Sequence, residues 1–238
     1  RGCLIAPEGE VLIGSDMVSL EDTTKRHYMK PLDPEYVAEM SVEGYDPHLQ
    51  LAKFAGACTQ EDIDQHTAGT KDMSSLRKNY KAVNYSAIYG VGAQKLARTT
   101  GMGQQEAKRL IEAYWKRNWA VKKVAESQKV REIGGEMWML NPVSNFWHNL
   151  RYEKDRFSTL NQSTGVFCFD TWVGLVKDSG LRVIAQFHDE ICVQVATEDA
   201  EAACAQLKNC IGAANMILQL NIQLDVDTQV GDNYASVH

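Results

Sequence analysis

The sequence lacks the features that would place it in several large classes of protein. No apolar run reaches the roughly 20 residues of a membrane-spanning helix, and no signal peptide precedes the first residues. None of the six cysteines forms a C-x-x-C pair, which favours reduced, mostly buried thiols over zinc ligands or disulfides. These absences predict a cytoplasmic protein with no membrane partner.

An excess of positive charge is missing as well. Lys and Arg number 25 against 31 Asp and Glu, for a net charge of −6. Because non-specific affinity for DNA comes mainly from Lys and Arg, this chain alone is expected to hold DNA poorly. Its length of 238 residues suits one large or two small domains. The first residue is Arg1 rather than Met, so we expect a processed piece, an excised segment or one half of a divided enzyme.

The most informative stretch is SSLRKNYKAVNYSAIYGVG, residues 74–92. Arg77, Lys81, Tyr85 and Tyr89 recur every four residues, which places them on one face of a helix. One interpretation is a merely solvated polar face. The other is a nucleoside triphosphate site, because two cations one turn apart suit a polyphosphate and the rings beyond them suit a sugar and a base.

The limits of this helix follow from its flanking residues. Ser74 or Ser75 is expected to cap its start, and Gly90 with Gly92 to end it, giving a helix from about Ser75 to Tyr89. The opposite face carries apolar side chains that can pack against other elements, namely Leu76, Val83, Ala87 and Ile88.

Carboxylates follow two apolar runs that read as buried strands. The run 11–14 leads into Ser15 and Asp16, and the runs 181–187 and 191–195 flank His188-Asp189-Glu190 as a predicted hairpin. Taken alone, Asp16 also fits an ordinary turn at a strand end. A pair of such acids is what magnesium-dependent phosphoryl transfer needs, since Mg²⁺ prefers oxygen ligands.

The remaining elements are predicted from periodicity, caps and glycines. Asp-Pro pairs at 33–34 and 46–47 indicate helix starts. The other predicted elements are helices at 20–29, 104–133 and 154–177, a hairpin of 137–140 with 146–150, a helix capped by Thr197 that ends near 218, and a strand at 222–226.

Three motifs in this order resemble the A family of DNA polymerases, which includes bacterial polymerase I and the podophage replicative enzymes. The order R-x-x-x-K-x-x-x-[F/Y]-x-x-x-Y-G resembles the family's nucleotide-binding helix. Asp16 with Glu21, in DMVSLE, resembles its first acidic motif, and His188-Asp189-Glu190 its third. The resemblance covers essentially the whole chain, and the tail from Gly231 to His238 is similar to the C-terminus of podophage polymerases.

The resemblance implies an α+β fold, with a palm of a small antiparallel sheet and packed helices, and helical fingers of a right-hand polymerase. We expect palm at 1–50, fingers at 51–133 with the nucleotide-binding helix at about 75–89, and palm again at 134–238. Thumb and exonuclease are expected on a separate or upstream polypeptide, and a processivity factor is a possible partner.

By the same resemblance, Asp16 and Asp189 hold two Mg²⁺ ions, with the Met17 carbonyl as a further ligand. Arg77 and Lys81 bind the phosphates, and Lys81 also protonates the pyrophosphate leaving group.

The family pattern also assigns the remaining nucleotide contacts. His48 assists at the phosphates, unless it is an ordinary surface residue. Glu21 and Tyr85 select the sugar, Tyr89 stacks near the insertion site, and Gly90 gives room there.

The same pattern suggests contacts to primer-template DNA. Gln162 reads the minor groove of the new base pair, with Arg156 and Asn161 as nearby candidates whose spacing departs from the family. His188 lies near the primer terminus, and Glu190 is an acid behind the metal ligands. The first motif departs too, because Val18 and Thr23 stand where the family has Ser and Arg.

The expected function is template-directed addition of deoxynucleoside triphosphates to a primer 3′-hydroxyl, in phage-type replication in the cytoplasm of an infected bacterium. Two alternatives stay open. A single-subunit RNA polymerase shares the nucleotide helix and a His-Asp hairpin, whereas Glu21 and Tyr85 favour deoxynucleotides. A non-catalytic polymerase-derived subunit has no physical need for two adjacent carboxylates, which are costly to hold together.

Overall fold

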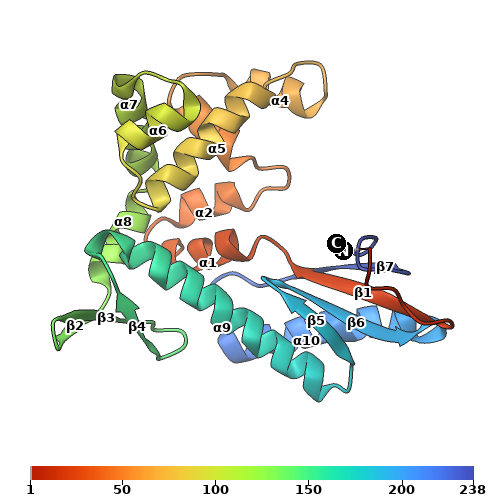
Figure 1. Cartoon of the computed structure of the whole chain (residues 1–238). Helices are drawn as coiled ribbons and strands as arrows, with labels where there is room; N and C mark the ends of the chain where they lie inside the picture. The colour runs from red at the N-terminus through yellow and green to blue at the C-terminus, as the bar shows by residue number, and fades with distance from the viewer. Residues whose placement is uncertain (1) are drawn as a thin grey trace. The chain divides into compact units, whose positions relative to one another are not determined.

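The computed structural model describes residues 2–238, which form two compact units (Figure 1). The first comprises the described residues up to Tyr28, Asn141–Phe146 and Asn161–His238, and the second comprises Met29–Leu140 and Trp147–Leu160. Within the described residues, no helix combines the length and apolar character needed to cross a membrane.

The first unit is built on an antiparallel sheet in the order β5-β6-β1-β7. Its strands are β1 (Glu10–Met17), β5 (Val183–Phe187), β6 (Glu190–Ala196) and β7 (Val226–Gly231). Helix α1 (Leu20–Met29) follows β1, and the 3-10 turn η2 (Thr197–Asp199) precedes α10.

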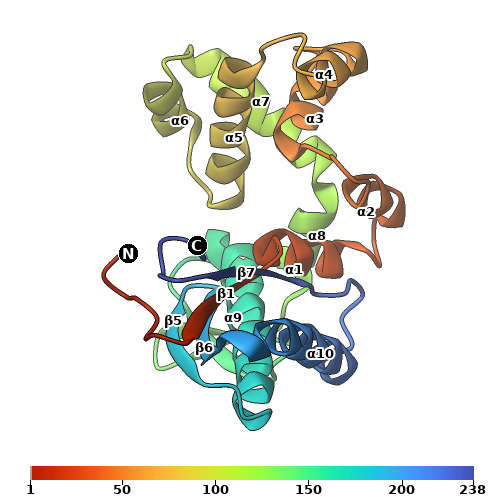
Figure 2. The same cartoon turned by 90° about the vertical axis from the view of Figure 1, so that its right-hand side faces the viewer.

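One face of this sheet is covered by helices. Helices α9 (Arg156–Asp178) and α10 (Ala200–Leu218) lie along it (Figures 1 and 2). The shared core is fully apolar and includes the buried side chains of Ile13, Met17, Trp172, Ile191 and Leu207. The other face of the sheet has a smaller apolar cluster of its own, which includes Leu12 and Cys192.

The second unit is mainly helical. Its helices are α2 (Pro34–Met40), α3 (Pro47–Phe54), α4 (Gln60–Thr67), α5 (Ser74–Ile88), α6 (Ala93–Thr100), α7 (Gln104–Arg117) and α8 (Trp119–Ser127). A three-stranded antiparallel sheet of β2 (Val130–Ile133), β3 (Glu136–Leu140) and β4 (Trp147–Leu150) follows, and then the short turn η1 (Glu153–Asp155).

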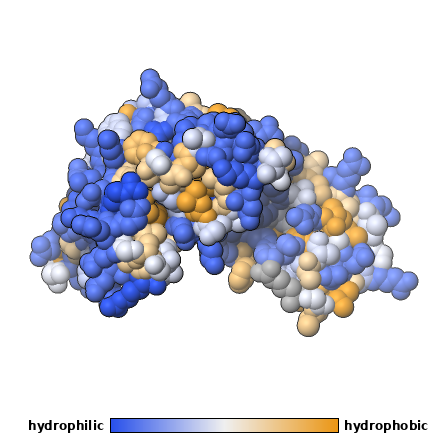
Figure 3. All heavy atoms as spheres, turned by 90° about the horizontal axis from the view of Figure 1, so that it is seen from above, coloured by the Kyte–Doolittle hydropathy of each residue, from blue (hydrophilic) through white to orange (hydrophobic). Residues whose placement is uncertain are grey.

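Helix α5 packs through the face that the sequence predicted to be apolar. Val83 and Ala87 are buried with Tyr80 against Leu96 and Tyr114 of the neighbouring helices. The predicted caps of two preceding helices are confirmed, because the Asp33 and Asp46 side chains accept hydrogen bonds from the first turns of α2 and α3. On the surface seen in Figure 3, apolar residues lie among hydrophilic ones over much of the molecule.

Several sequence predictions were wrong in detail. Helix α5 starts after Met73 with no side-chain cap, so neither Ser74 nor Ser75 has the expected role. The predicted helix at 104–133 is broken at Asn118, whose side chain donates to the Tyr114 carbonyl at 3.0 Å, and residues 130–133 pair with β3 instead. The last strand begins at Val226.

The six cysteines are free thiols that differ in exposure. Cys168, Cys192 and Cys210 are buried, Cys58 and Cys204 are partly exposed, and Cys3 is exposed. Burial raises the pKa of Cys168 to about 12, which makes this thiol unreactive.

The predicted domain limits differ from the two compact units. Residues 29–50 belong with the helical unit here, whereas the prediction assigned 1–50 to the palm. The small antiparallel sheet with packed helices and the separate helical part agree with the predicted α+β class. The assignment of palm and fingers to particular residues stays a prediction.

Candidate active-site residues

Both predicted metal ligands lie in the first unit and close to one another. Asp16 is the penultimate residue of β1, and Asp189 lies in the turn between β5 and β6. The Met17 N–H donates to the Asp189 carbonyl at 3.1 Å, which ties this turn to β1. Pairing of β1 with β6 therefore brings together two acids that are separated by most of the sequence.

A third carboxylate that the sequence analysis missed lies beside them. Asp227 of β7 is the direct cross-strand partner of Asp16. Partial burial, and next the charges of Asp189 and Asp227, raise the pKa of Asp16. No motif surrounds Asp227, so only the register of β7 against β1 identifies it.

These acids fit a magnesium site in their chemistry. Their oxygens are hard ligands, and a bound cation would relieve the repulsion that raises the pKa of Asp16. Across residues 2–238, no group of three or more His, Cys, Asp or Glu side chains has the geometry to hold a metal ion. Mg²⁺ commonly takes only one or two protein carboxylates and completes its shell with water and substrate phosphates.

We predict that Asp16→Asn stabilises the metal-free chain. A carboxyl whose folded pKa is raised destabilises the fold when ionised, and this penalty disappears as the pH falls through the folded pKa. The unfolding temperature in chelator should therefore rise at neutral pH, by about 2–4 °C at most because the group is partly solvated. The gain should shrink toward acid pH. Equal Tm values at neutral pH, or a gain shared by Asp170→Asn at an exposed position within α9, would contradict the prediction.

The turn that carries Asp189 has two residues with different surroundings. His188 is 84% exposed in its side chain and lies 3.3 Å from the Asp189 carboxylate through Nδ1. Its φ of 61° lies in the left-handed region that tight hairpin turns require. Glu190, the first residue of β6, is by contrast only 4% exposed, and its supporting role stays a prediction.

Helices α1 and α9 hold the remaining candidates of the first unit. Glu21 is exposed in the first turn of α1, and its carbonyl accepts from the Asn161 side chain at 2.9 Å. Asn161 is 1% exposed, so it supports α1 and is not available as a DNA contact in this structure. Gln162, the next residue, is exposed. In the second unit, Arg156 pairs with Glu153 at 2.7 Å.

The cationic end of α5 is oriented by α3. The Asp46 side chain, which caps α3, also accepts a hydrogen bond from Nε of Arg77. Partial burial opposes ionisation of Asp46, but the Arg77 contact and two N–H donors of α3 lower its pKa overall. Asp46 therefore fixes one side of the Arg77 guanidinium, and the Arg77 side chain as a whole remains 42% exposed. The Asp-Pro pattern at 46–47 predicted only a helix start here.

The aromatic end of α5 also has a partner in α3. The Tyr85 and Tyr89 rings stack with centroids 6.4 Å apart, and Lys81 lies over the Tyr85 ring at 5.9 Å. His48 lies 6.3 Å from Tyr85 between ring centroids, and its Nδ1 is 2.9 Å from the Asn84 amide. The structure thus places His48 beside the predicted nucleotide-binding face.

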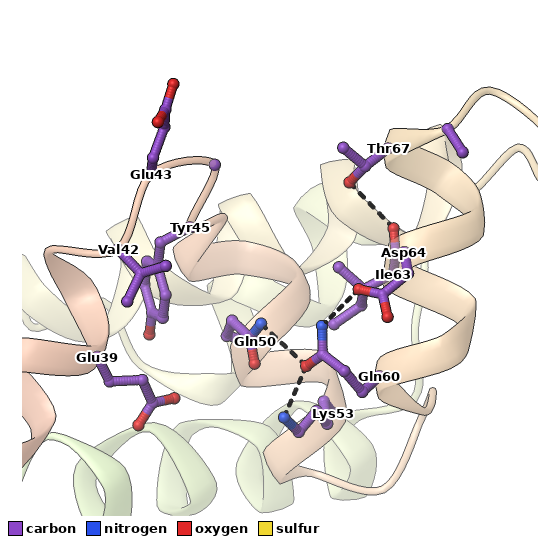
Figure 4. Close-up of a pocket in the computed structure, with 12 residues that line it drawn as sticks. Glu39, Val42, Glu43, Tyr45, Gln50, Lys53, Gln60, Ile63, Asp64 and Thr67 are labelled. Carbon is purple, nitrogen blue, oxygen red and sulfur yellow. Dashed lines mark hydrogen bonds between the residues drawn. The ribbon is translucent and has the colours of Figure 1, made fainter.

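A separate pocket of about 660 Å³ lies between α2, α3 and α4 (Figure 4). Gln60 spans it, accepting from Lys53 at 2.8 Å and donating to Asp64 at 2.9 Å. Glu39, Glu43 and Tyr45 line its other side (Figure 4). None of the predicted site residues lines this pocket.

The first unit carries neighbouring acids at strand ends, and the second unit carries a helix with cations and stacked rings. Residues 1–136 match the family described as DNA polymerase family A. This is more than half of the chain, and the chain belongs to that family. The predicted resemblance is confirmed at this level, while nothing distinguishes the podophage branch.

Curated relatives extend the match over the whole chain. DNA polymerase I of Thermus aquaticus is 22% identical over 250 residues, covering 99% of this chain and 28% of the relative. DNA polymerase I of Pseudomonas aeruginosa is 24% identical over 257 residues, covering 100% of this chain and 26% of the relative. The chain thus spans about a quarter of the length of these relatives.

A solved structure supports the fold. The POL domain of Pol1 from M. smegmatis, in complex with DNA primer-template and dNTP, superposes with a TM-score of 0.69 at 21% identity. The match covers 100% of this chain and 42% of that one. It confirms the predicted fold class, a polymerase architecture of palm and fingers type.

Proposed function

We propose that this chain carries the palm and fingers of a DNA polymerase and adds deoxynucleotides to a primer 3′-hydroxyl in the 5′ to 3′ direction. The proposal rests mainly on the proximity of Asp16, near the end of β1, and Asp189, in the turn before its partner strand β6, in a family A chain. The exposed cations and stacked tyrosines of α5 support the same reading.

Asp16, Asp189 and the Met17 carbonyl are the groups that would hold Mg²⁺, as two ions. When bound, Mg²⁺ would favour ionisation of the 3′-hydroxyl and neutralise phosphate charge. Arg77, held by Asp46, and Lys81 bind the triphosphate, and Lys81 donates a proton to the departing pyrophosphate.

His48 stands beside the phosphates, held through Asn84. Glu21 and Tyr85 select the sugar, and Tyr89 stacks near the base. Gly90, at φ 64°, allows the close approach of the Lys154 side chain, and an added Cβ would lie 3.2 Å from it. Gln162 and the exposed His188 contact the DNA, with Arg156 as a further candidate.

Primer extension tests the proposal directly. The chain is incubated with primer-template, Mg²⁺ and deoxynucleotides, alone and with the polypeptide that carries thumb and exonuclease. Template-directed extension in either case supports a polymerase. Activity that appears only when the second polypeptide is added indicates a divided enzyme whose DNA binding depends on that partner. Absence of extension under both conditions would favour a non-catalytic subunit. Extension with ribonucleotides in preference to deoxynucleotides would instead indicate an RNA polymerase.

We predict that Tyr85→Phe increases discrimination against dideoxynucleotides. The Tyr85 hydroxyl is expected to stand in for the missing 3′-hydroxyl, so its removal should lower dideoxynucleotide incorporation about tenfold, the value of one or two hydrogen bonds. Incorporation of ordinary deoxynucleotides should change little. The ratio of the two kcat/KM values measures the effect. An unchanged ratio would show that the Tyr85 hydroxyl does not contact the sugar of the incoming nucleotide.

The proposal includes the replication system in which the chain acts. Replication of phage-type DNA in an infected bacterial host fits the tail from Gly231 to His238, and a processivity factor is a possible added partner. Co-purification with a host protein during infection would support both.

A further inference from the structure

The sheet face that carries the acids is partly covered by residues of the same chain. Side chains alternate along β1, so Leu12, Gly14 and Asp16 share the face away from the apolar core of α9 and α10. The direct partner of Asp16 on β6 is Glu190, which places the Glu190 side chain on this face as well. The face therefore holds a supporting acid next to the candidate metal ligands.

Residues 232–238, called the tail segment below, turn back over this face (Figure 2). Two backbone hydrogen bonds to the first residues of the chain fix it, from Ala6 N–H to Asp232 and from Tyr234 N–H to Leu4. Tyr234 and Val237 are buried there against Leu12 and Cys192.

Glycine at position 14 makes this packing possible. A Cβ built on Gly14 would overlap the carbonyl oxygen of Val237, which is backbone and cannot move aside as a side chain would. Gly14 lies two residues before Asp16, so the tail segment crosses β1 next to the candidate metal ligand. The conformational freedom of glycine is not needed at this position, but its small size is.

The tail segment binds Glu190 directly. The Tyr234 hydroxyl donates to Oε2 of Glu190 at 3.4 Å, and Nδ1 of His238 contacts the same oxygen. The Tyr234 and His238 rings lie 5.6 Å apart. A carboxylate that is 4% exposed is costly to bury without such partners, so these contacts hold Glu190 in place. Glu190 is joined by one peptide bond to Asp189.

We propose that Tyr234 and His238 are positioning residues that hold Glu190 and thereby fix the turn presenting Asp189 for metal binding and synthesis. This inference rests on the proposed function but concerns residues outside the family's acidic motifs. His238 acts through Glu190 and does not touch the reacting atoms.

The test compares His238→Ala with the conservative His238→Gln, whose amide can still donate to Glu190. Mn²⁺ binding to the chain is measured by electron paramagnetic resonance without nucleotide, beside kcat and the Kd for primer-template, with the thumb polypeptide present if synthesis requires it. We expect His238→Ala to weaken Mn²⁺ binding and lower kcat about tenfold each, in the range for groups that orient metal ligands. The Kd for DNA should not change, and His238→Gln should recover most of the loss.

Gly14→Ala displaces the tail segment without altering any polar group, so it should reproduce the loss of Mn²⁺ affinity. Gly212→Ala, in α10 where an added Cβ meets nothing within 4 Å, is the matched control and should leave Mn²⁺ binding unchanged. If Gly14→Ala does not fold, the two His238 variants still decide the question.

Unchanged Mn²⁺ affinity in His238→Ala, with a loss confined to DNA binding, would overturn the inference and make His238 a DNA contact. Altered Mn²⁺ affinity in a chain that synthesises no DNA under any condition would support the positioning role while refuting the proposed polymerase function.

Discussion

Asp189→Asn should reduce DNA synthesis by about three orders of magnitude or more, since a lost metal ligand removes several kcal/mol of transition-state stabilisation and each 1.36 kcal/mol is a factor of ten. Asn is close to Asp in size, and the Asp189 side chain is 37% exposed, so the fold should be retained. Single-turnover primer extension gives the rate, and circular dichroism checks the fold.

The control for this variant is Asp178→Asn, at the exposed end of α9 and outside the candidate site. It should synthesise DNA at the rate of the unaltered chain. Near-normal synthesis by Asp189→Asn would refute the proposed metal site, because that site depends on the two neighbouring carboxylates of Asp16 and Asp189.

Lys81→Ala should lower kcat about 10²–10³-fold, the range expected when a positioned proton donor is lost. Part of the loss reflects weaker triphosphate binding. The Lys81→Arg variant separates this binding effect from the loss of the proton donor. Arg keeps the positive charge but cannot give up a proton in a protein, so this variant should retain nucleotide affinity and still have a low kcat. Pre-steady-state incorporation at varied nucleotide concentration resolves the two quantities.

Lys108→Ala is the matched control. Lys108 is an exposed lysine of α7 and does not belong to the row of four residues on α5. Its removal should change neither quantity appreciably. If Lys81→Arg restored full kcat, Lys81 would be a phosphate-binding charge only, and the proton would come from another donor.

Local sequence signals predicted much of the helical face and the acidic hairpin. Four-residue spacing placed Arg77, Lys81, Tyr85 and Tyr89 on one face of α5, because helical periodicity depends only on neighbouring residues. Apolar runs around His188-Asp189 located β5 and β6 for the same reason. Asp-Pro pairs located two helix starts, since their capping geometry is local.

Contacts between distant segments were outside the reach of such patterns. Asp227 faces Asp16 through strand register, and Asp46 reaches Arg77 across 31 positions of sequence. The break at Asn118 was missed because no Pro or Gly marks it, and an ordinary side chain bonding back to the Tyr114 carbonyl ends the helix. Burial of Asn161 likewise depends on the carbonyl of Glu21, 140 positions away.

The alternation along β1 couples correct folding to chemical competence. Met17 is 1% exposed in the apolar core, while its neighbour Asp16 faces the other way. A slip of one residue in the pairing of β1 with β6 would exchange the two faces, driving a carboxylate among Ile191 and Val193 and exposing Met17. Such a misfolded state is penalised by the cost of burying a charge. The hydrophobic core therefore selects the strand register that also aligns the acids of the candidate site.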